Sequence, residues 1–236
     1  ISPWDPEMVQ IQVFEPPGVA ISEKRQKDIE KYYGRQDFRR AFYSEFGEIQ
    51  FPDRAMETYV RGLTRSLDIE SVRDRAFRLV IDYSYSAASL ILPNVLGRLN
   101  AEVLSVRAFS DQRYTSLSAE ELGRDIAEVS GLVKVMGADM GLVISPGGER
   151  LFVVDEHGEE VPVEKTLLLF VRLVAERAGK GAKIVLPLTV TRVAERLAEA
   201  FDVEIVRSKV SMPGFTRAAS EENVVFAGAL GGYVFP

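Results

Sequence analysis

The stretch of this sequence whose residue types could do chemistry is a six-residue loop at 145–150. It lies between two short apolar runs, Met140–Ile144 and Leu151–Val154, which predict strands that would hold it at the edge of a sheet. The loop contains one carboxylate, Glu149, and one guanidinium, Arg150. A hard cation such as Mg²⁺ needs several oxygen ligands, usually including carboxylates. We therefore expect one glutamate beside a serine hydroxyl to form a poor metal cage.

Strands alternating with helices are predicted on both sides of this loop, so we expect two βαβ units with parallel strands and right-handed crossovers. Ser118 followed three residues later by Glu121 predicts a capping box at the start of one of these helices. The expected elements around the two units are strands at 77–82, 102–106, 183–186 and 203–206, and helices at 87–99, 118–136, 163–178 and 190–201.

The first fifty residues are predicted to hold less regular structure. A strand-like run at 9–14 precedes a Pro-Pro-Gly turn, and Ser22 is expected to cap a helix that continues to about Arg40. Residues 45–52 are predicted to form a connector. The spacing of apolar residues then predicts a further helix from Asp53 to near Asp68.

Composition narrows the classes of function that this chain can have. The 236 residues carry a net charge of -6, which disfavours general binding to nucleic acid, because neutralising phosphates requires a basic surface. The chain has no cysteine, which excludes disulfides and thiolate catalysis, and its single histidine, His157, falls in a predicted exposed turn. No apolar run reaches the length of a membrane span, so we expect a cytoplasmic protein without a membrane partner.

The residues around the loop resemble a known family. Residues 138–144 read Ala-Asp-x-Gly followed by three apolar residues, and residues 151–158 read Leu-x-Val-Val-Asp-x-x-Gly. This pattern is similar to the second domain of the alpha-D-phosphohexomutases, the phosphoglucomutase/phosphomannomutase superfamily. The resemblance implies an α/β fold: two phosphohexomutase-like α/β domains with mixed, mostly parallel sheets and βαβ crossovers, plus the tail of a preceding domain. The implied domain ranges are 1–44, 45–160 and 161–236.

The resemblance also identifies what the loop has lost. In the family this loop reads Asp-Gly-Asp-x-Asp-Arg, and its three carboxylates hold Mg²⁺. Ser145 and Gly147 stand where two of these aspartates would be, Glu149 stands at the third, and only Arg150 matches outright. Glu149 is thus the remnant of a metal site. We expect no bound cofactor, with Mg²⁺ required only if the chain is an active mutase.

Two other family motifs are replaced in the same way. Ser2 falls at the position of the family's phosphoserine, but Ser-Pro-Trp-Asp replaces Ser-His-Asn-Pro, which favours an ordinary serine. The family's sugar-recognition loop, Gly-Glu-x-Ser-Gly-His, corresponds to residues 226–233, where Ala229, Gly231 and Tyr233 replace Glu, Ser and His. These substitutes cannot donate and accept hydrogen bonds as a sugar diol requires.

One charged residue lies in a segment that matches its family motif more closely. Lys209 lies in Arg-Ser-Lys-Val, close to the family's Arg-Thr-Lys-Val, which makes it a candidate for facing an anion beside Arg150. The alternative is a solvated lysine at the end of a strand.

Three functions follow from these observations. The first is a degenerate phosphohexomutase-like module, without mutase activity, in nucleotide-sugar biosynthesis. The second is an active phosphohexomutase that interconverts hexose 1- and 6-phosphates with Ser2 and Mg²⁺, and the third is a sugar-phosphate sensor. The carboxylate count of the metal loop favours the first.

The resemblance further points to what surrounds the module. It is closest to the mutase-like region fused to mannose-1-phosphate guanylyltransferase-type nucleotidyltransferases, on the basis of residues 33–40, 47–49 and 82–85. The chain is accordingly expected to be a fragment of a larger polypeptide. Its expected partners are the other domains of that polypeptide, and a sugar phosphate and a second copy in a homo-oligomer are the open alternatives. In the family a polar cleft between the domains binds the sugar phosphate. Here its expected lining includes Pro146, Gly147, Gly148, Ala229, Leu230 and Tyr233, and we expect the cleft to be narrowed, filled by its own loops or occupied by another part of the larger polypeptide.

Overall fold

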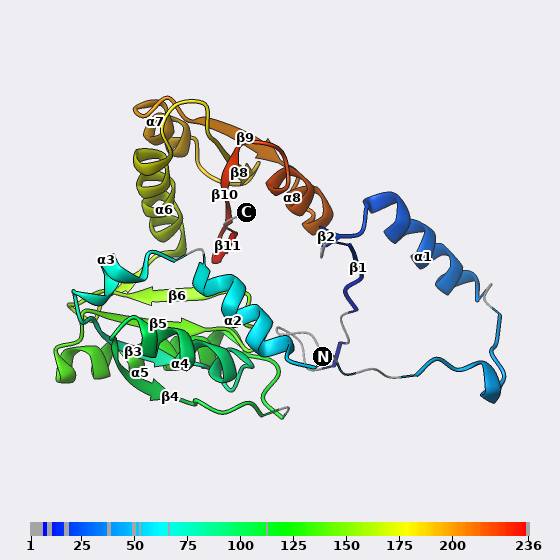
Figure 1. Cartoon of the computed structure of the whole chain (residues 1–236), viewed down its shortest axis with the longest axis horizontal. Coiled ribbons are helices and arrows are strands. Elements are labelled where there is room, and N and C mark those ends of the chain that lie inside the picture. Colours follow the sequence, from blue (N-terminus) through cyan, green and yellow to red (C-terminus); the bar gives the residue numbers. More distant parts are fainter. Residues whose placement is uncertain are drawn as a thin grey trace.

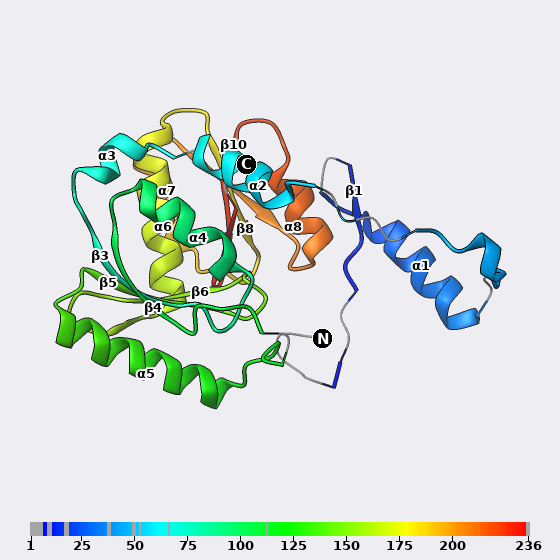
Figure 2. The same cartoon turned by 60° about the horizontal axis from the view of Figure 1, so that its bottom comes forward.

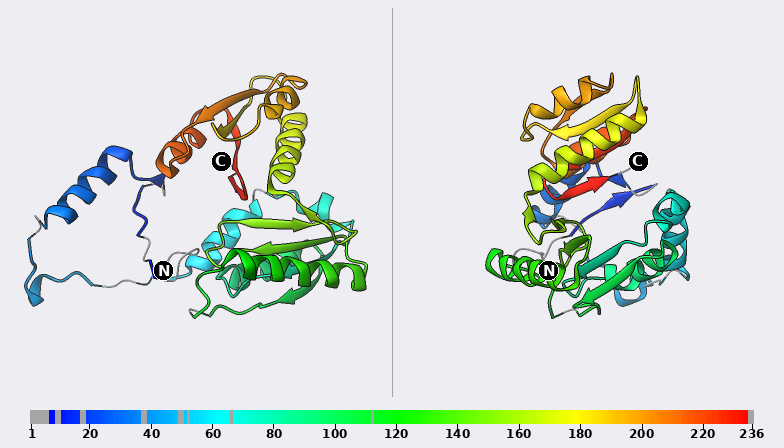
Figure 3. Two further views of the ribbon diagram at one scale, coloured as in Figure 1. Left: turned by 180° about the vertical axis from the view of Figure 1, so that it is seen from behind. Right: turned by 90° about the vertical axis from the view of Figure 1, so that its left-hand side faces the viewer.

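The computed structural model describes residues 7–8, 11–16, 19–36, 39–48, 51, 53–65, 67–111 and 113–234. Two lobes, each built around its own sheet, account for most of these residues (Figure 1). A third part, which contains the N-terminal helix α1 (Glu23–Arg35), extends away from both lobes, as the view from behind also shows (Figure 3). This arrangement is a mixed α/β fold with parallel strand pairs at the centre of each sheet, as the sequence predicted.

The first lobe contains a five-stranded sheet in the order β4-β3-β5-β6-β7. Strand β3 lies between β4 and β5 and runs parallel to both, whereas β6 and β7 continue the sheet as antiparallel strands. The strand bounds are Arg78–Asp82 for β3, Glu102–Val106 for β4, Met140–Ile144 for β5, Leu151–Val154 for β6 and Glu160–Val161 for β7.

Helices cover both faces of this sheet because successive residues of β3 point to opposite sides. Leu79 and Ile81 pack against α4 (Ala88–Arg98), and Val80 packs against α5 (Ala119–Met136). Figure 2 shows the sheet between these two helices. Two shorter helices, α2 (Ala55–Arg65) and α3 (Ile69–Arg73), precede β3, and α2 packs beside α4.

The predicted capping box at the start of α5 is confirmed. The Oγ atom of Ser118 accepts a hydrogen bond from the backbone N–H of Glu121 at 3.2 Å, and the Glu121 carboxylate accepts from the Ser118 N–H at 2.9 Å. Gly137 then ends the helix in the left-handed conformation, with a φ of 60°. The local sequence therefore fixes both ends of the helix that leads into β5.

The second lobe contains a four-stranded sheet in the order β11-β10-β8-β9. Strand β8 (Lys183–Pro187) runs parallel to β9 (Glu204–Ser208) and to β10 (Val224–Ala229), and β11 (Gly232–Val234) is antiparallel to β10. Helices α6 (Val163–Ala178) and α7 (Val193–Glu199) pack on one face, and α8 (Met212–Ala219) packs on the other.

The N-terminal part is shorter in regular structure than the sequence predicted. A two-stranded hairpin joins β1 (Phe14–Glu15) to β2 (Val19–Ala20), so Phe14 alone of the predicted strand at 9–14 lies in a described strand, and residues 9 and 10 lie outside the described residues. Ser22 caps α1 as predicted, but the helix ends at Arg35 rather than near Arg40, because Gln36 adopts a left-handed conformation with a φ of 53°. A short 3-10 helix follows at Tyr43–Glu45.

Three segments differ from what the sequence predicted. Residues 226–233, which the resemblance matches to the family's sugar-recognition loop, lie in the hairpin of β10 and β11. The helix predicted at 190–201 is limited to α7, because the carbonyl groups before it accept hydrogen bonds from a side chain of β9. Helix α8 was not predicted. Among the described residues, every helix is too short or too polar to cross a lipid bilayer.

Candidate functional site

The carboxyl ends of β3 and β5 are the edge of the first sheet where a ligand site is expected. The chain leaves β3 through α4 on one face and returns to β5 through α5 on the opposite face. Neighbouring parallel strands with connections on opposite faces leave a crevice at their carboxyl ends, where open α/β sheets bind ligands. Two segments line this edge, the turn at 83–86 after β3 and the loop at 145–150 after β5.

The turn after β3 adopts a conformation that usually requires glycine. Ser84 and Tyr85 have φ values of 43° and 57°, although neither is glycine. The Asp82 carboxylate supports the turn by accepting a hydrogen bond from the Ser84 N–H at 2.9 Å. The hydroxyl groups of Ser84 and Ser86 are buried without a hydrogen-bond partner among the described residues. The turn thus keeps a strained backbone and places polar groups in the interior.

Beneath this turn, Asp82 and Arg107 form a buried ion pair between the ends of β3 and β4. The guanidinium of Arg107 donates to both carboxylate oxygens of Asp82, and it also contacts Asp125 at 3.0 Å and Glu128 at 2.9 Å on α5. Burial alone would lower the pKa of Arg107, but these carboxylates raise it well above its usual value. One cation is therefore shared by three carboxylates.

The environment of Asp125 raises the pKa of its carboxyl group. Burial raises the pKa of its carboxyl group to about 6, and the charges of Asp82 and Glu128 add to this effect, while Arg107 opposes it. Asp125 therefore binds a proton more readily than an ordinary aspartate does.

The loop after β5 is closed by its own hydrogen bonds. The buried Ser145 hydroxyl accepts from the backbone N–H of Arg150 at 3.1 Å, and the Ser145 N–H donates to the Arg150 carbonyl at 2.9 Å. The N–H of Gly148, whose φ is 71°, donates to the Ser145 carbonyl at 2.8 Å. The hydroxyl that replaces a family aspartate is thus turned into the loop rather than toward a ligand.

These residues do not fit Mg²⁺. Glu149 supplies the only carboxylate of the loop, and the Ser145 hydroxyl is engaged within the loop. In the part of the chain that the structure describes, no group of three or more His, Cys, Asp or Glu residues is placed to hold a metal ion. Since Mg²⁺ is bound through carboxylates together with water or phosphate, this loop lacks the charge that would offset dehydration of the ion.

The same loop contacts the hairpin of the second lobe. The N–H of Leu151 donates to the carbonyl of Gly231 at 2.9 Å. Beside this bond lies a pocket of about 260 Å³, lined by residues of both lobes: Tyr59, Ala88, Ile91, Leu92, Ile144, Gly148, Glu149, Arg150, Leu151, Gly231 and Tyr233. The Tyr233 hydroxyl is buried without a hydrogen-bond partner among the described residues, and burial raises its pKa.

The structure brings together some of the predicted site residues and separates others. Glu149 and Arg150 line the pocket between the lobes. Lys209 does not line it and instead contacts Glu23 at the start of α1, with 3.2 Å between its Nζ atom and the carboxylate. Ser2 lies outside the described residues. Sequence reasoning missed the pairing of Asp82 with Arg107, although both residues follow neighbouring strands and could have been placed at one edge.

Comparison with known proteins finds a family model that is similar to the first lobe. Residues 57–158 match the sequence model of the phosphoglucomutase/phosphomannomutase alpha/beta/alpha domain II. The matched residues include the whole sheet of the first lobe except β7, together with α4 and α5, so the crevice at 83–86 and 145–150 lies within the region that resembles this domain.

Relatives extend the similarity over the rest of the chain. A phosphoglucomutase/phosphomannomutase of Thermococcus kodakarensis is 28% identical over 232 residues, which cover 98% of this chain and 50% of the relative. A phosphoglucosamine mutase of Methanocaldococcus jannaschii is 25% identical over 227 residues, with 94% and 50% coverage. The chain thus spans about half the length of these curated phosphohexomutase relatives.

A solved structure agrees at the level of the fold. The crystal structure of a phosphoglucomutase/phosphomannomutase family protein from Burkholderia thailandensis superposes with a TM-score of 0.75 at 20% identity. The superposition covers 92% of this chain and 46% of that one. Both lobes, and not only the matched region, therefore share the fold of that protein.

Proposed function

We propose that this chain is a phosphohexomutase-type module that no longer transfers phosphate with the help of Mg²⁺. The observation that carries the proposal is the Ser145 hydroxyl, which is buried and accepts the N–H of Arg150 in place of facing a cation. Glu149 alone offers a carboxylate at this loop. A mutase would need a cation to activate its nucleophile, and these side chains do not supply the ligands for one.

Titration calorimetry of the chain with millimolar Mg²⁺ tests the proposal. We expect no saturable heat, in the wild type or in Glu149→Gln. Saturable binding that disappears in Glu149→Gln would overturn the proposal, because it would show that one carboxylate is sufficient to hold the ion.

A coupled assay for the interconversion of hexose 1- and 6-phosphates by this chain provides a second test. We expect no turnover. Turnover that Ser2→Ala abolishes would establish the active mutase instead, with Ser2 as its nucleophile.

A second candidate function is the binding of a sugar phosphate without turnover. It is favoured by the pocket between the lobes, where Arg150 offers a cation and Tyr233 a buried hydroxyl without a described partner. Under this proposal, hexose 6-phosphate binds the chain, and Arg150→Gln weakens binding at least ten-fold through loss of a charge-assisted hydrogen bond. Equal affinity of the variant and the wild type would exclude this pocket.

We further propose that the module serves nucleotide-sugar biosynthesis within a longer polypeptide that includes a nucleotidyltransferase. The support is the sequence resemblance at 33–40, 47–49 and 82–85. The gene sequence on both sides of this segment tests the proposal, and a reading frame without a nucleotidyltransferase would contradict it.

A further inference from the structure

A small pocket lies at the carboxyl ends of β3, β4 and β5 in the first lobe. Its volume is about 110 Å³. The turn after β3, the segment after β4, the start of α5 and Pro146 of the loop after β5 form its walls. None of its lining residues also lines the pocket beside Arg150, so the two pockets are separate.

The surroundings of this pocket carry more negative than positive charge. Arg107 is the one basic residue among the described residues that line it, and three carboxylates contact this guanidinium. One of them, Asp125, also lines the pocket, and burial raises its pKa to about 6. Glu121 is a further lining carboxylate, and hydrogen bonds from Ser118 lower its pKa. A cation in the pocket would offset this surplus of negative charge.

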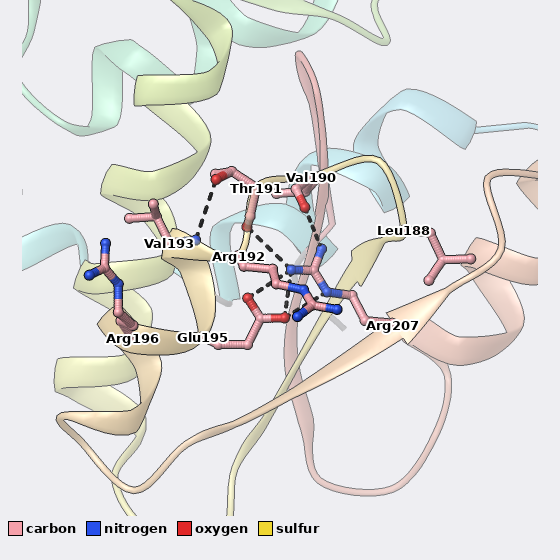
Figure 4. Close-up of a pocket in the computed structure, with 8 residues that line it drawn as sticks. All are labelled: Leu188, Val190, Thr191, Arg192, Val193, Glu195, Arg196 and Arg207. Carbon is pink, nitrogen blue, oxygen red and sulfur yellow. Dashed lines mark hydrogen bonds and ion pairs between the residues drawn. The ribbon is translucent and has the colours of Figure 1, made fainter.

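The corresponding edge of the second sheet has a different balance of charge. There the guanidinium of Arg207 donates to the Glu195 carboxylate at 2.9 and 2.6 Å, and it also donates to carbonyl groups of the loop after β8 (Figure 4). One carboxylate thus pairs with this guanidinium, whereas three contact Arg107 in the first lobe. The excess of carboxylates is therefore a feature of the first lobe and not of the shared strand order.

A buried hydroxyl group without a partner belongs to the same pocket. Ser84 lines the pocket and is 3% exposed, and its Oγ atom has no hydrogen-bond partner among the described residues. The Asp82 carboxylate accepts from the backbone N–H of Ser84 at 2.9 Å, which holds this residue in place. A buried polar group without a partner is unfavourable, and a hydroxyl oxygen can accept a hydrogen bond from a ligand. The pocket therefore offers an acceptor that a donor group would satisfy.

The remaining walls of the pocket are aromatic and aliphatic. The rings of Tyr85 and Tyr114 are stacked with their centroids 4.4 Å apart, and Leu117 and Pro146 lie at the same pocket. Aromatic rings attract cations, and these carbon-rich walls suit a hydrocarbon chain. The volume is well below the roughly 300 Å³ at which pockets for drug-sized ligands begin. The ligand is therefore small.

We propose that this pocket binds the ammonium group of a short primary amine. The Asp125 carboxylate and the Ser84 hydroxyl accept hydrogen bonds from the ammonium group, and the carbon chain lies against Tyr85 and Leu117. An ammonium group meets both needs of the pocket, because it is a cation and a hydrogen-bond donor. A divalent metal ion fits less well, since in the described part of the chain no three carboxyl or imidazole ligands are grouped to hold one. The proposal does not depend on whether the chain has mutase activity.

Titration calorimetry of the chain with propylammonium chloride, at neutral pH and constant low ionic strength, tests the proposal. Propanol, which has the same chain without the charge, and potassium chloride are the comparison ligands. We expect saturable binding of propylammonium, weaker binding of potassium and no binding of propanol. Asp125→Asn should weaken the binding of propylammonium at least ten-fold, through loss of a charge-assisted hydrogen bond.

The matched control is Glu120→Gln, which removes the same charge from the first turn of the same helix at a position that does not line the pocket. We expect this control to bind like the wild type. An equal loss of affinity in Asp125→Asn and Glu120→Gln would overturn the proposal, because it would show a non-specific effect of net charge. Failure of the wild type to bind propylammonium, or equal binding of propanol or potassium, would overturn it as well.

Ser84→Ala separates binding from a structural role of the hydroxyl. This variant should bind propylammonium about three- to ten-fold more weakly, the effect of one hydrogen bond. Its melting temperature without ligand should not fall, because the hydroxyl has no partner in the free protein. Wild-type affinity in Ser84→Ala would contradict the assigned role of Ser84 and the proposal with it.

Discussion

The backbone N–H of Leu151 donates a hydrogen bond to the carbonyl of Gly231 at 2.9 Å, and this bond joins the sheets of the two lobes. Leu151 is the first residue of β6, and Gly231 lies in the turn between β10 and β11. Because both partners are backbone groups, the contact depends on the conformation of the turn and not on the side chains. Changes to the backbone of that turn are therefore the most direct way to disturb it.

Replacing Gly231 with alanine should destabilise the protein by about 1–2 kcal/mol, because a residue with a Cβ atom is strained in the left-handed region. The φ of Gly231 is 87°, and the nearest atoms to a new Cβ would be side-chain carbons of Arg150 at 3.7 Å, which is an ordinary contact. Strain and not crowding is thus the expected cause. Urea unfolding measures the effect.

Gly123→Ala is the matched control for this change. Gly123 lies within α5, where an added Cβ would meet no atom within 4 Å. An alanine there should stabilise the protein by about 0.5–1 kcal/mol, because glycine is unfavourable inside a helix. The same loss of stability in both variants would contradict the role assigned to the turn.

Replacing Asp125 with asparagine should stabilise the protein at neutral pH. The folded pKa of Asp125, about 6, exceeds the usual value of an aspartate, so the folded state favours the protonated form. The stability that this group contributes is complete below about pH 4 and is lost as the pH rises through about 6. Asparagine keeps an oxygen at the position that lies 3.0 Å from Nη2 of Arg107, and it removes the surplus charge.

Thermal unfolding between pH 3.5 and pH 8 checks this prediction. At pH 7.5 we expect the melting temperature of Asp125→Asn to exceed that of the wild type by about 2–4 °C, the change that 1 kcal/mol produces in a protein of this size. The difference should vanish near pH 4. A difference that does not change with pH would show that the charge of Asp125 is not its cause.

Replacing Arg207 with lysine should loosen the loop between β8 and α7. An ammonium group has three donors and cannot reproduce the fork that reaches Glu195 and three carbonyl groups. We expect a loss of about 1–3 kcal/mol, as for a buried acceptor that loses its partner, and faster proteolytic cleavage within residues 188–192. Arg172→Lys, at an exposed position on α6, should leave both measurements unchanged.

The strands of both central βαβ units were predictable from the sequence, because short runs rich in valine and isoleucine mark buried parallel strands. The structure places β4, β5 and β6 at the predicted bounds. Helix α8 escaped prediction because its first residues read Met-Pro-Gly, which is typical of a turn. The hairpin of β10 and β11 was taken for a loop because glycine and alanine weaken the strand signal.

The candidate site was predictable only in part. Glu149 and Arg150 could be found because they lie together in one loop. The pairing of Asp82 with Arg107 required knowledge that β3 and β4 are neighbours, and the bond between Leu151 and Gly231 has no side-chain signature at all. The conformations of Ser84 and Tyr85 were likewise hidden, since neither residue type favours a positive φ.

The two sheets draw on separate, contiguous stretches of the chain, and this has a consequence for how the protein is made. Every strand of the first sheet precedes α6, and every strand of the second follows it. Because domains fold as units, beginning at the N-terminus during synthesis, the first lobe has all of its strands before the ribosome adds those of the second. The hydrogen bond from Leu151 to Gly231 therefore forms late. The first lobe is already folded when the hairpin of β10 and β11 packs against it.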